Sequence, residues 1–183
     1  MHGYDIDDVN EFIAYHIANG GVSRYKKFDY FFNNILKRND KNLIDQALLN
    51  FSNNVLDGLM NCELNLSLCE LKNIYNKSRW AVASGGDESE LRHVFNKRDI
   101  TDLFELGIFG SPKSKEEIMR SIVNRSELEQ PALFIGDSFY DYKAAKDFDL
   151  DFLFIEEWSE YNNWKKHIGD DKFFYMQSLE DLL

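Results

Sequence analysis

The sequence predicts an α/β protein made of a small all-helical unit followed by a Rossmann-like parallel sheet flanked by helices. Two observations support this fold class. Apolar residues recur at helical spacing through residues 1–61, whereas from residue 62 short apolar runs alternate with helical segments. Repeated strands, turns and capped helices are typical of a parallel sheet with helices on its faces. We therefore expect a helical unit over residues 1–61 and an α/β unit over residues 62–183.

Three helices are expected in the helical unit. Gly20-Gly21 separates the first from the second, and Arg38-Asn39-Asp40 separates the second from the third. Each helix has one face of recurring side chains that we expect to pack inward. These faces are Val9, Phe12, Ile13, His16 and Ile17; then Phe28, Phe31, Phe32, Ile35 and Leu36; then Ile44, Ala47, Leu48, Phe51 and Val55.

Five short strands are expected in the α/β unit, preceded by a helix over residues 64–75. The strands are residues 80–83, 106–109, 132–135, 152–155 and 173–175. The first three are followed by helix-start signals, which are Asp87-x-x-Glu90, Ser114-x-x-Glu117 and Ser138-x-x-Asp141. Because ligands bind at the carboxyl ends of strands in such sheets, the polar residues after these strands form the candidate site.

Composition narrows the classes of partner. The 183 residues carry 32 acidic and 21 basic side chains, a net charge of -11, which disfavours nucleic acid and membrane surfaces as partners. A small phosphorylated metabolite is compatible with this charge, because a local pocket can be positive. Cys62 and Cys69 fit no zinc or redox motif, so we expect reduced thiols and a cytoplasmic protein. The sequence leaves the oligomeric state and the identity of the substrate open.

The strand at residues 132–135 ends in Gly136-Asp137-Ser138-x-x-Asp141. A carboxylate that emerges from a buried strand needs a partner, and Mg²⁺ suits two carboxylates at this spacing. We therefore expect Asp137 and Asp141 to lie at a Mg²⁺ site. The alternative for Asp141 is that it only caps the helix that follows.

Two further clusters follow the first and second strands. The hydroxyl of Ser84 and the backbone amides of Gly85 and Gly86 can hold a phosphate oxygen, although an ordinary turn has the same composition. Lys115 lies in the first turn of a helix, where its charge opposes the helix dipole unless an anion sits opposite. The alternative is a solvated surface lysine. Lys113 is the less suitable candidate, because it precedes the helix start.

Together these clusters resemble the second, third and fourth motifs of the haloacid dehalogenase-like hydrolases, most of which are phosphatases. Ser84, Lys115 and Gly136-Asp137-Ser138-x-x-Asp141 occur in the family's order, each after its own strand. The segment from Asn19 to Phe28, NGGVSRYKKF, resembles the helical cap of the phosphoglycolate phosphatase-like branch. SGGDESELR from Ser84 to Arg92 and Gly110-Ser111-Pro112 fit the same branch. The resemblance covers nearly the whole chain.

The resemblance implies a Mg²⁺-dependent phosphoric monoester hydrolase that acts on a small phosphate ester, such as a sugar phosphate or a phosphoglycolate-like compound. It implies an aspartyl-phosphate intermediate. Ser84-Gly85-Gly86 would bind the phosphoryl oxygens, and Lys115 would pair with both the nucleophile and the phosphate. Asp137 would bind Mg²⁺, directly or through water, while Asp141 would orient Asp137 or share the metal.

The resemblance also assigns roles in the helical unit. Ser23, Arg24 and Lys27 would face the active site and read the leaving group of the substrate. The alternative is a solvated surface that touches no substrate.

The sequence departs from the family in its first motif, a hydrophobic strand that ends in Asp-x-Asp-Gly. Asp5-Ile6-Asp7 follows no apolar strand and continues as a helix, so we do not expect it to supply the nucleophile. We expect an N-terminally shortened phosphatase that is inactive as written. The alternatives are a catalytically dead protein that binds a phosphorylated ligand or a protein, and a split enzyme whose missing strand comes from another chain. Without that strand, two inner sheet edges would lose their shared neighbour.

Overall fold

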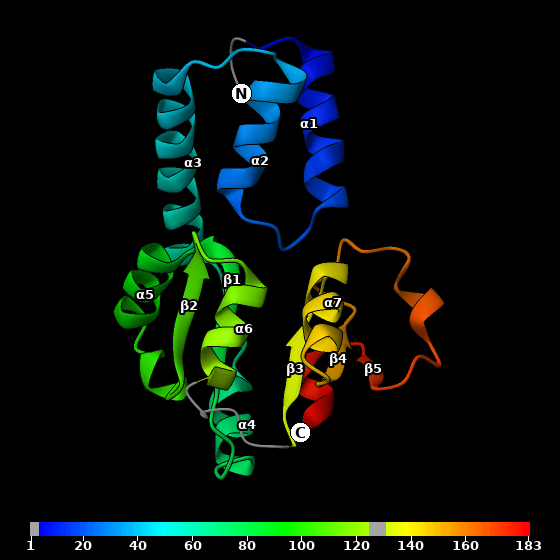
Figure 1. Ribbon diagram of the computed structural model, residues 1–183. Coiled ribbons are helices and arrows are strands. Elements are labelled where there is room, and N and C mark those ends of the chain that lie inside the picture. The colour runs from blue at the N-terminus through cyan, green and yellow to red at the C-terminus, as the bar shows by residue number, and fades with distance from the viewer. Residues whose placement is uncertain (1–3, 125–130) are drawn as a thin grey trace.

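The computed structural model describes residues 4–124 and 131–183. The helical unit lies at one end of the molecule, above two separate sheets (Figure 1). It consists of α1 (Ile6–Ala18), α2 (Arg24–Tyr30), which continues as a π-helix over Phe31–Ile35, and α3 (Lys41–Asn61). The three helices lie where the hydrophobic periodicity predicts them.

The helical unit has its own aromatic core. Phe12, Phe28, Phe31 and Phe32 are each exposed by 6% or less, and all four belong to the faces that the sequence predicts to be buried. Side-chain oxygens of Asp5, Ser23 and Asp40 accept hydrogen bonds from backbone amides at the starts of the three helices. Within residues 4–124 and 131–183, no helix has the length and apolar character needed to cross a membrane.

The α/β unit alternates strands and helices, which confirms the predicted fold class. The helix expected over residues 64–75 is shorter than predicted, because Asn65 forms a turn with the backbone amides of Ser67 and Leu68. The elements in chain order are α4 (Leu68–Ile74), β1 (Ala81–Asp87), α5 (Glu88–Lys97), β2 (Gly107–Ser111), α6 (Lys115–Asn124), β3 (Leu133–Gly136), α7 (Phe139–Asp147), β4 (Asp151–Ile155) and β5 (Phe173–Met176).

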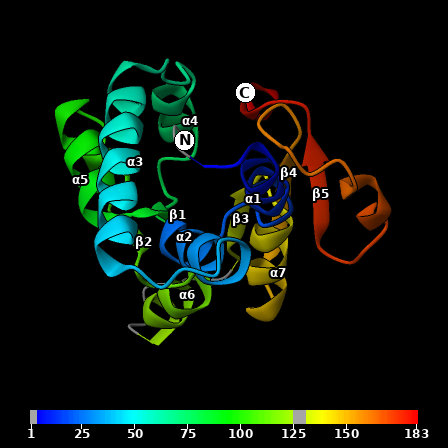
Figure 2. The same ribbon diagram turned by 90° about the horizontal axis from the view of Figure 1, so that it is seen from above.

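The strands form two parallel sheets rather than one. β1 pairs with β2, with Ala83 opposite Phe109, and β3, β4 and β5 form the second sheet, with Phe134 opposite Phe152. Figures 1 and 2 place the two sheets on opposite sides of the molecule. Among the described residues, β1 and β3 each have one strand neighbour. The open inner edges that the sequence predicts are therefore present.

The main hydrophobic core lies between α6, α7 and the second sheet. Its centre is β4, where every residue from Phe152 to Ile155 is buried. β3 differs, because Leu133 and Ile135 are 50% and 40% exposed. β3, which pairs with one strand among the described residues, therefore has apolar side chains that are partly exposed to solvent. The other core residues are Phe109, Ile118, Met119, Ile122, Tyr142, Ala145, Leu150, Trp164 and Phe173.

Candidate active site between the helical unit and the strand ends

A cavity of about 650 Å³ lies between the helical unit and the carboxyl ends of β1 and β3. It brings together most of the residues that the sequence singles out. Ser84, Gly85, Gly86, Lys115 and Asp137 line it from the α/β unit, and Arg24 and Lys27 line it from the helical unit. Ser23 lines a smaller adjoining pocket together with Ser84 and Lys115.

Lys115 and Asp141 form a buried ion pair at the floor of this region. The Lys115 Nζ contacts Asp141 Oδ1, and the two residues are 6% and 3% exposed. The other carboxylate oxygen of Asp141 accepts hydrogen bonds from the Ser138 hydroxyl at 2.6 Å and the Ser138 amide at 3.2 Å. Ser138, the N-cap, and Asp141 therefore form the capping box of α7, and Asp141 also holds the ammonium group of Lys115 in place. Lys113, the less suitable alternative, is exposed.

Gly136 makes this arrangement possible. A Cβ atom at position 136 would lie 2.6 Å from the Cβ of Asp141, a separation that folded proteins do not tolerate. The strand end and the first turn of α7 can therefore approach this closely only where residue 136 is glycine. The close approach accounts for the Gly-Asp-Ser-x-x-Asp spacing in physical terms.

Asp137 is a half-buried carboxyl group beside that ion pair. Burial raises the pKa of Asp137, and the nearby charge of Asp141 raises it further, while the charge of Lys115 lowers it. The attraction of Lys115 therefore does not offset the combined cost of burying the Asp137 carboxylate and placing it near Asp141. Its carboxylate fits Mg²⁺, an ion that uses one or two protein carboxylates and completes its shell with water and phosphate oxygens. Among the described residues, no three His, Cys, Asp or Glu side chains are grouped into a protein-only cage.

Ser84 lies on an extension of β1 that the sequence does not predict. The strand continues to Asp87, and α5 begins at Glu88, so Ser84 lies within the strand rather than after it as expected. Strand-like backbone continues here because the pairing of β1 with β2 resumes, after an irregularity, at Asp87 and Ser111. The Ser84 Oγ accepts a hydrogen bond from the Gly86 amide at 3.0 Å.

The end of β1 after Ser84 touches the helical unit directly. The hydroxyl of Ser111, at the end of β2, donates to the Gly85 carbonyl at 2.8 Å and so holds the end of β1 against β2. A Cβ atom at residue 85 would lie 2.4 Å from the carbonyl oxygen of Gly21. The two backbones therefore meet at a point with no room for a side chain. The roles of Ser111 and Gly21 in this contact are not predicted from the sequence.

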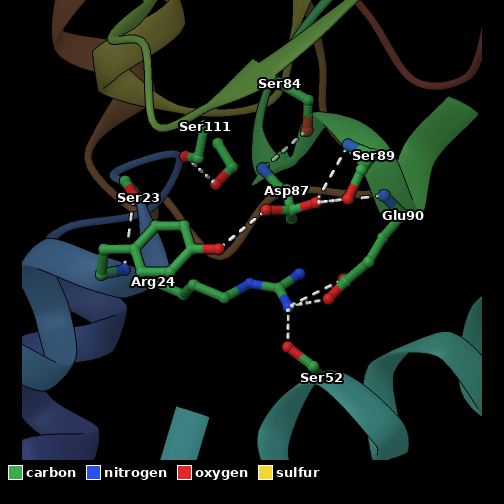
Figure 3. A network of polar contacts seen from close by, with 11 residues as sticks. Ser23, Arg24, Ser52, Ser84, Asp87, Ser89, Glu90 and Ser111 are labelled. Carbon is green, nitrogen blue, oxygen red and sulfur yellow. Dashed lines mark hydrogen bonds and ion pairs between the residues drawn. The ribbon is translucent and has the colours of Figure 1, made fainter. Parts of the chain in front are cut away.

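Arg24 belongs to a polar network that joins α2 to α5 and α3 (Figure 3). Its Nη1 donates to Glu90 Oε1 at 3.0 Å and to Ser52 Oγ at 3.0 Å, and it lies 2.8 Å from Glu90 Oε2. Beside it, the Tyr25 hydroxyl donates to Asp87 Oδ2 at 2.7 Å. The expected capping box of α5 is incomplete, because Asp87 caps the helix while Glu90 pairs with Arg24 instead of returning to the cap.

The three predicted specificity residues of the helical unit have different surroundings. The Ser23 hydroxyl caps α2, and Arg24 is in the ion pair with Glu90, so a role for either in reading a leaving group stays a prediction. Lys27 is 5% exposed and lines the cavity, with its Nζ 3.3 Å from His16 Nδ1 and 3.4 Å from the His16 carbonyl. Glu160 also lines the cavity.

The fold was compared with known proteins. No protein-family model and no curated protein matches the sequence. A presumed phosphatase from Clostridium difficile has a similar structure, with a TM-score of 0.62 and 15% identity over 98% of this chain and 83% of its own. A hydrolase of the haloacid dehalogenase-like family from Streptococcus pneumoniae matches with a TM-score of 0.60 and 16% identity over 96% of this chain and 89% of its own. The chain has the haloacid dehalogenase-like fold. The resemblance inferred from its motifs is thus confirmed at the level of fold.

Within this haloacid dehalogenase-like fold, two groups around Lys27 are not predicted from the sequence. His16 is on α1 and Glu160 follows β4, so neither is near Lys27 along the chain. The helical periodicity predicts His16 on the inward face of α1, but His16 is exposed, as are Ile13 and Ile17 of that face. No further signal in the sequence relates His16 to Lys27.

Proposed function

We propose that this chain forms the cap and most of the catalytic unit of a Mg²⁺-dependent phosphatase for small phosphate monoesters. The observation that carries the proposal is the convergence of Ser84, Lys115 and Asp137 on one cavity beneath the helical unit. These groups combine hydrogen-bond donors, a cation and a metal-binding carboxylate, which are the groups that a phosphoryl site needs. The names of the two similar structures are consistent with this class of reaction.

The phosphoryl group would bind at the end of β1. The Ser84 hydroxyl and the amides that follow it would donate hydrogen bonds to phosphoryl oxygens. Lys115 would offset the phosphate charge from the start of α6, and its buried pair with Asp141 holds the ammonium group in one position. These residues would orient the phosphate before any bond is broken.

Asp137 would be the protein's direct ligand to Mg²⁺, with Asp141 beside it. When bound, Mg²⁺ would offset the combined negative charge of the phosphate and the carboxylates. Two carboxylates alone hold Mg²⁺ weakly, because the ion gives up its water reluctantly. Titration calorimetry of the 183-residue chain with MgCl2 should therefore show weak binding, and tight binding without a phosphate ligand would contradict this assignment.

We further propose that the nucleophile lies on a strand between β1 and β3 in the active protein. The open inner edges of these strands and the exposed Leu133 and Ile135 support this position. An aspartate there would attack phosphorus and form an aspartyl phosphate, with the substrate alcohol as the leaving group. A second aspartate two residues later would protonate the ester oxygen as its bond to phosphorus breaks, so that it leaves as the alcohol, and would then activate the water that releases phosphate. The strand would belong to a longer form of this chain or, alternatively, to another chain.

The test compares the 183-residue chain with the protein isolated from its native source. Phosphate release is measured with phosphoglycolate and a panel of sugar phosphates, in MgCl2 and in EDTA. We expect Mg²⁺-dependent turnover only in a form that carries an additional strand with Asp-x-Asp. In that form, Lys115→Met should reduce turnover about a hundredfold or more, because it removes a charge at the phosphate.

The matched control is Lys97→Met, which removes the same charge from an exposed lysine at the end of α5 that lines neither pocket, and it should leave turnover unchanged. A strand-bearing protein that binds these esters but hydrolyses none of them would overturn the phosphatase proposal. That outcome would instead favour the binding protein considered as the alternative.

We also propose a cytoplasmic location. Cys62 and Cys69 are both free and exposed thiols, which suits a reducing compartment. Alkylation of unreduced protein from the source organism tests this point, and blocked or disulfide-linked thiols would contradict it.

A further inference from the structure

Lys27 is a buried cation whose contacts differ from those of the other buried cations. Arg24 and Lys115 are also buried, and each pairs with a carboxylate within hydrogen-bond distance. Among the described residues, no carboxylate forms an ion pair with Lys27, and its ammonium contacts the ring and carbonyl of His16. An ammonium group removed from water without an anion carries a large desolvation cost.

The charged groups around Lys27 do not offset the desolvation cost of its ammonium group. Glu160 lines the same cavity and favours the charged lysine, but burial has the larger effect and lowers the pKa of Lys27. Burial and the charge of Lys27 likewise lower the pKa of His16, while Glu160 opposes that shift. Arg24, the nearest cation on the same face of α2, is engaged by Glu90. An anion from outside the protein is the group that would complete this site.

The position of Lys27 relative to the phosphoryl site indicates where such an anion would come from. Lys27 and the phosphate-binding groups line one cavity, Lys27 from the helical unit and Lys115 from the α/β unit. Phe12, Phe28 and Val55 of the helical unit contribute apolar walls to the same cavity. Apolar walls strengthen the attraction between an ammonium group and an anion, because they exclude water. A phosphate ester bound at the strand ends would direct its leaving group towards Lys27.

We propose that Lys27, with His16 beside it, is a specificity-determining residue that binds a second anionic group on the substrate's leaving group. This inference rests on the proposed phosphatase function. It narrows the substrate class to phosphate monoesters that carry a carboxylate or a further phosphate, and it disfavours neutral sugar monophosphates.

The test uses phosphonates, because they mimic phosphate esters and cannot be hydrolysed, so it needs no nucleophile. Titration calorimetry measures the affinity of the 183-residue chain in MgCl2 for propylphosphonate, 3-phosphonopropionate and propane-1,3-bisphosphonate. We expect one or both of the doubly acidic ligands to bind about tenfold or more tightly than propylphosphonate, as a charge-assisted contact should allow. The comparison of the two identifies whether the second group is a carboxylate or a phosphate-like anion.

Two substitutions of Lys27 and one control test whether this residue causes the preference for a second acidic group. Lys27→Met has a similar length and suits the apolar walls, so it should keep the fold and the affinity for propylphosphonate while removing the preference for a second acid. Lys27→Arg should retain part of the preference. Lys41→Met, which removes the same charge from an exposed lysine at the start of α3 that lines neither pocket, should leave all three affinities unchanged.

The outcomes separate this inference from the proposed function. Equal affinity for the three ligands, or a preference that survives Lys27→Met, would overturn the role of Lys27 and leave the phosphate site standing. A Lys27-dependent preference that Lys115→Met does not weaken would support the inference and contradict the phosphate site. Failure of every phosphonate to bind would overturn both.

Discussion

At the scale of single residues, the site depends on two carboxyl groups with different surroundings. Asp141 is compensated by Lys115 and by the hydrogen bonds of Ser138, whereas Asp137 is half-buried and less compensated. The first therefore contributes to structure, and the second is left available for a cation.

Asp141→Asn should destabilise the protein by about 3 kcal/mol, because it leaves the buried ammonium of Lys115 without a negative partner. Urea denaturation followed by circular dichroism measures the change. Asp147→Asn is the matched control, since it removes a charge from the exposed end of the same helix and should change stability by less than about 0.5 kcal/mol. Equal effects of the two substitutions would mean that the ion pair adds no stability.

Asp137→Asn should stabilise the metal-free protein at neutral pH. The folded state raises the pKa of Asp137, so the folded carboxyl group binds its proton more tightly than the unfolded one. Its effect on stability therefore becomes unfavourable as the pH rises from the unfolded pKa through the folded pKa. The advantage of the Asn variant should be largest at neutral pH and shrink as the pH approaches 4. Thermal melts across this range measure it, and an advantage that grows towards acid would contradict the assignment.

At the scale of elements, the contact between α2 and α5 holds the helical unit against the α/β unit. Arg24 reaches Glu90 across this boundary, and Tyr25 reaches Asp87 beside it (Figure 3). Glu90 Oε2 is buried and, within the described part of the chain, accepts no hydrogen bond although it lies in the ion pair. The contact is thus sensitive to loss of the arginine.

Arg24→Ala should destabilise the protein by about 2 kcal/mol, because it leaves the Glu90 carboxylate buried without its partner. It should also speed amide hydrogen exchange around Gly21 and Gly85, where the two units touch, and weaken the binding of propylphosphonate. The double variant Arg24→Ala with Glu90→Gln should recover part of the stability, since no charge is then left unpaired. Unchanged exchange in the single variant would contradict a role in holding the two units together.

At the scale of the whole molecule, each of the two sheets has an open edge, because β1 and β3 each pair with one strand among the described residues. The exposed apolar side chains of β3 make that sheet a surface suited to pairing with another strand. This property follows from the chain's own structure and does not depend on any reaction.

The 183-residue chain should therefore associate weakly with itself at high concentration. Ile135→Lys should reduce this association by placing a charge at the open edge, as sedimentation velocity over a range of concentrations would show. Leu66→Lys is the control, because Leu66 is an exposed apolar residue in a different part of the chain. A chain that stays monomeric throughout, or a control that acts as strongly as Ile135→Lys, would contradict this prediction.

Much of this architecture could be predicted because it depends on local sequence. Phe12 and Phe28 are buried as their helical spacing requires, and the strand before Gly136 ends where its apolar run ends. The extension of β1 to Asp87 could not be predicted, because it depends on pairing with Ser111 on another strand.

The same limit applies within the site. Asp137 and Lys115 could be identified because each follows the carboxyl end of its own strand, where α/β folds place their ligand-binding residues. The pairing of Arg24 with Glu90 could not be, because the two residues are 66 positions apart and meet only when the two units pack. The contact between Lys27 and His16 likewise depends on how α1 and α2 pack.

The separation of the two sheets has a consequence for cooperativity. Each sheet comes from one continuous stretch of chain, residues 81–111 and residues 133–176, so neither needs strands from the other to complete its ladder. In native-state hydrogen exchange, the two sheets should open as separate units with different free energies. A strand inserted between β1 and β3 would hydrogen-bond to both and merge them into one unit. The strand that carries the nucleophile would then also make the two sheets unfold together.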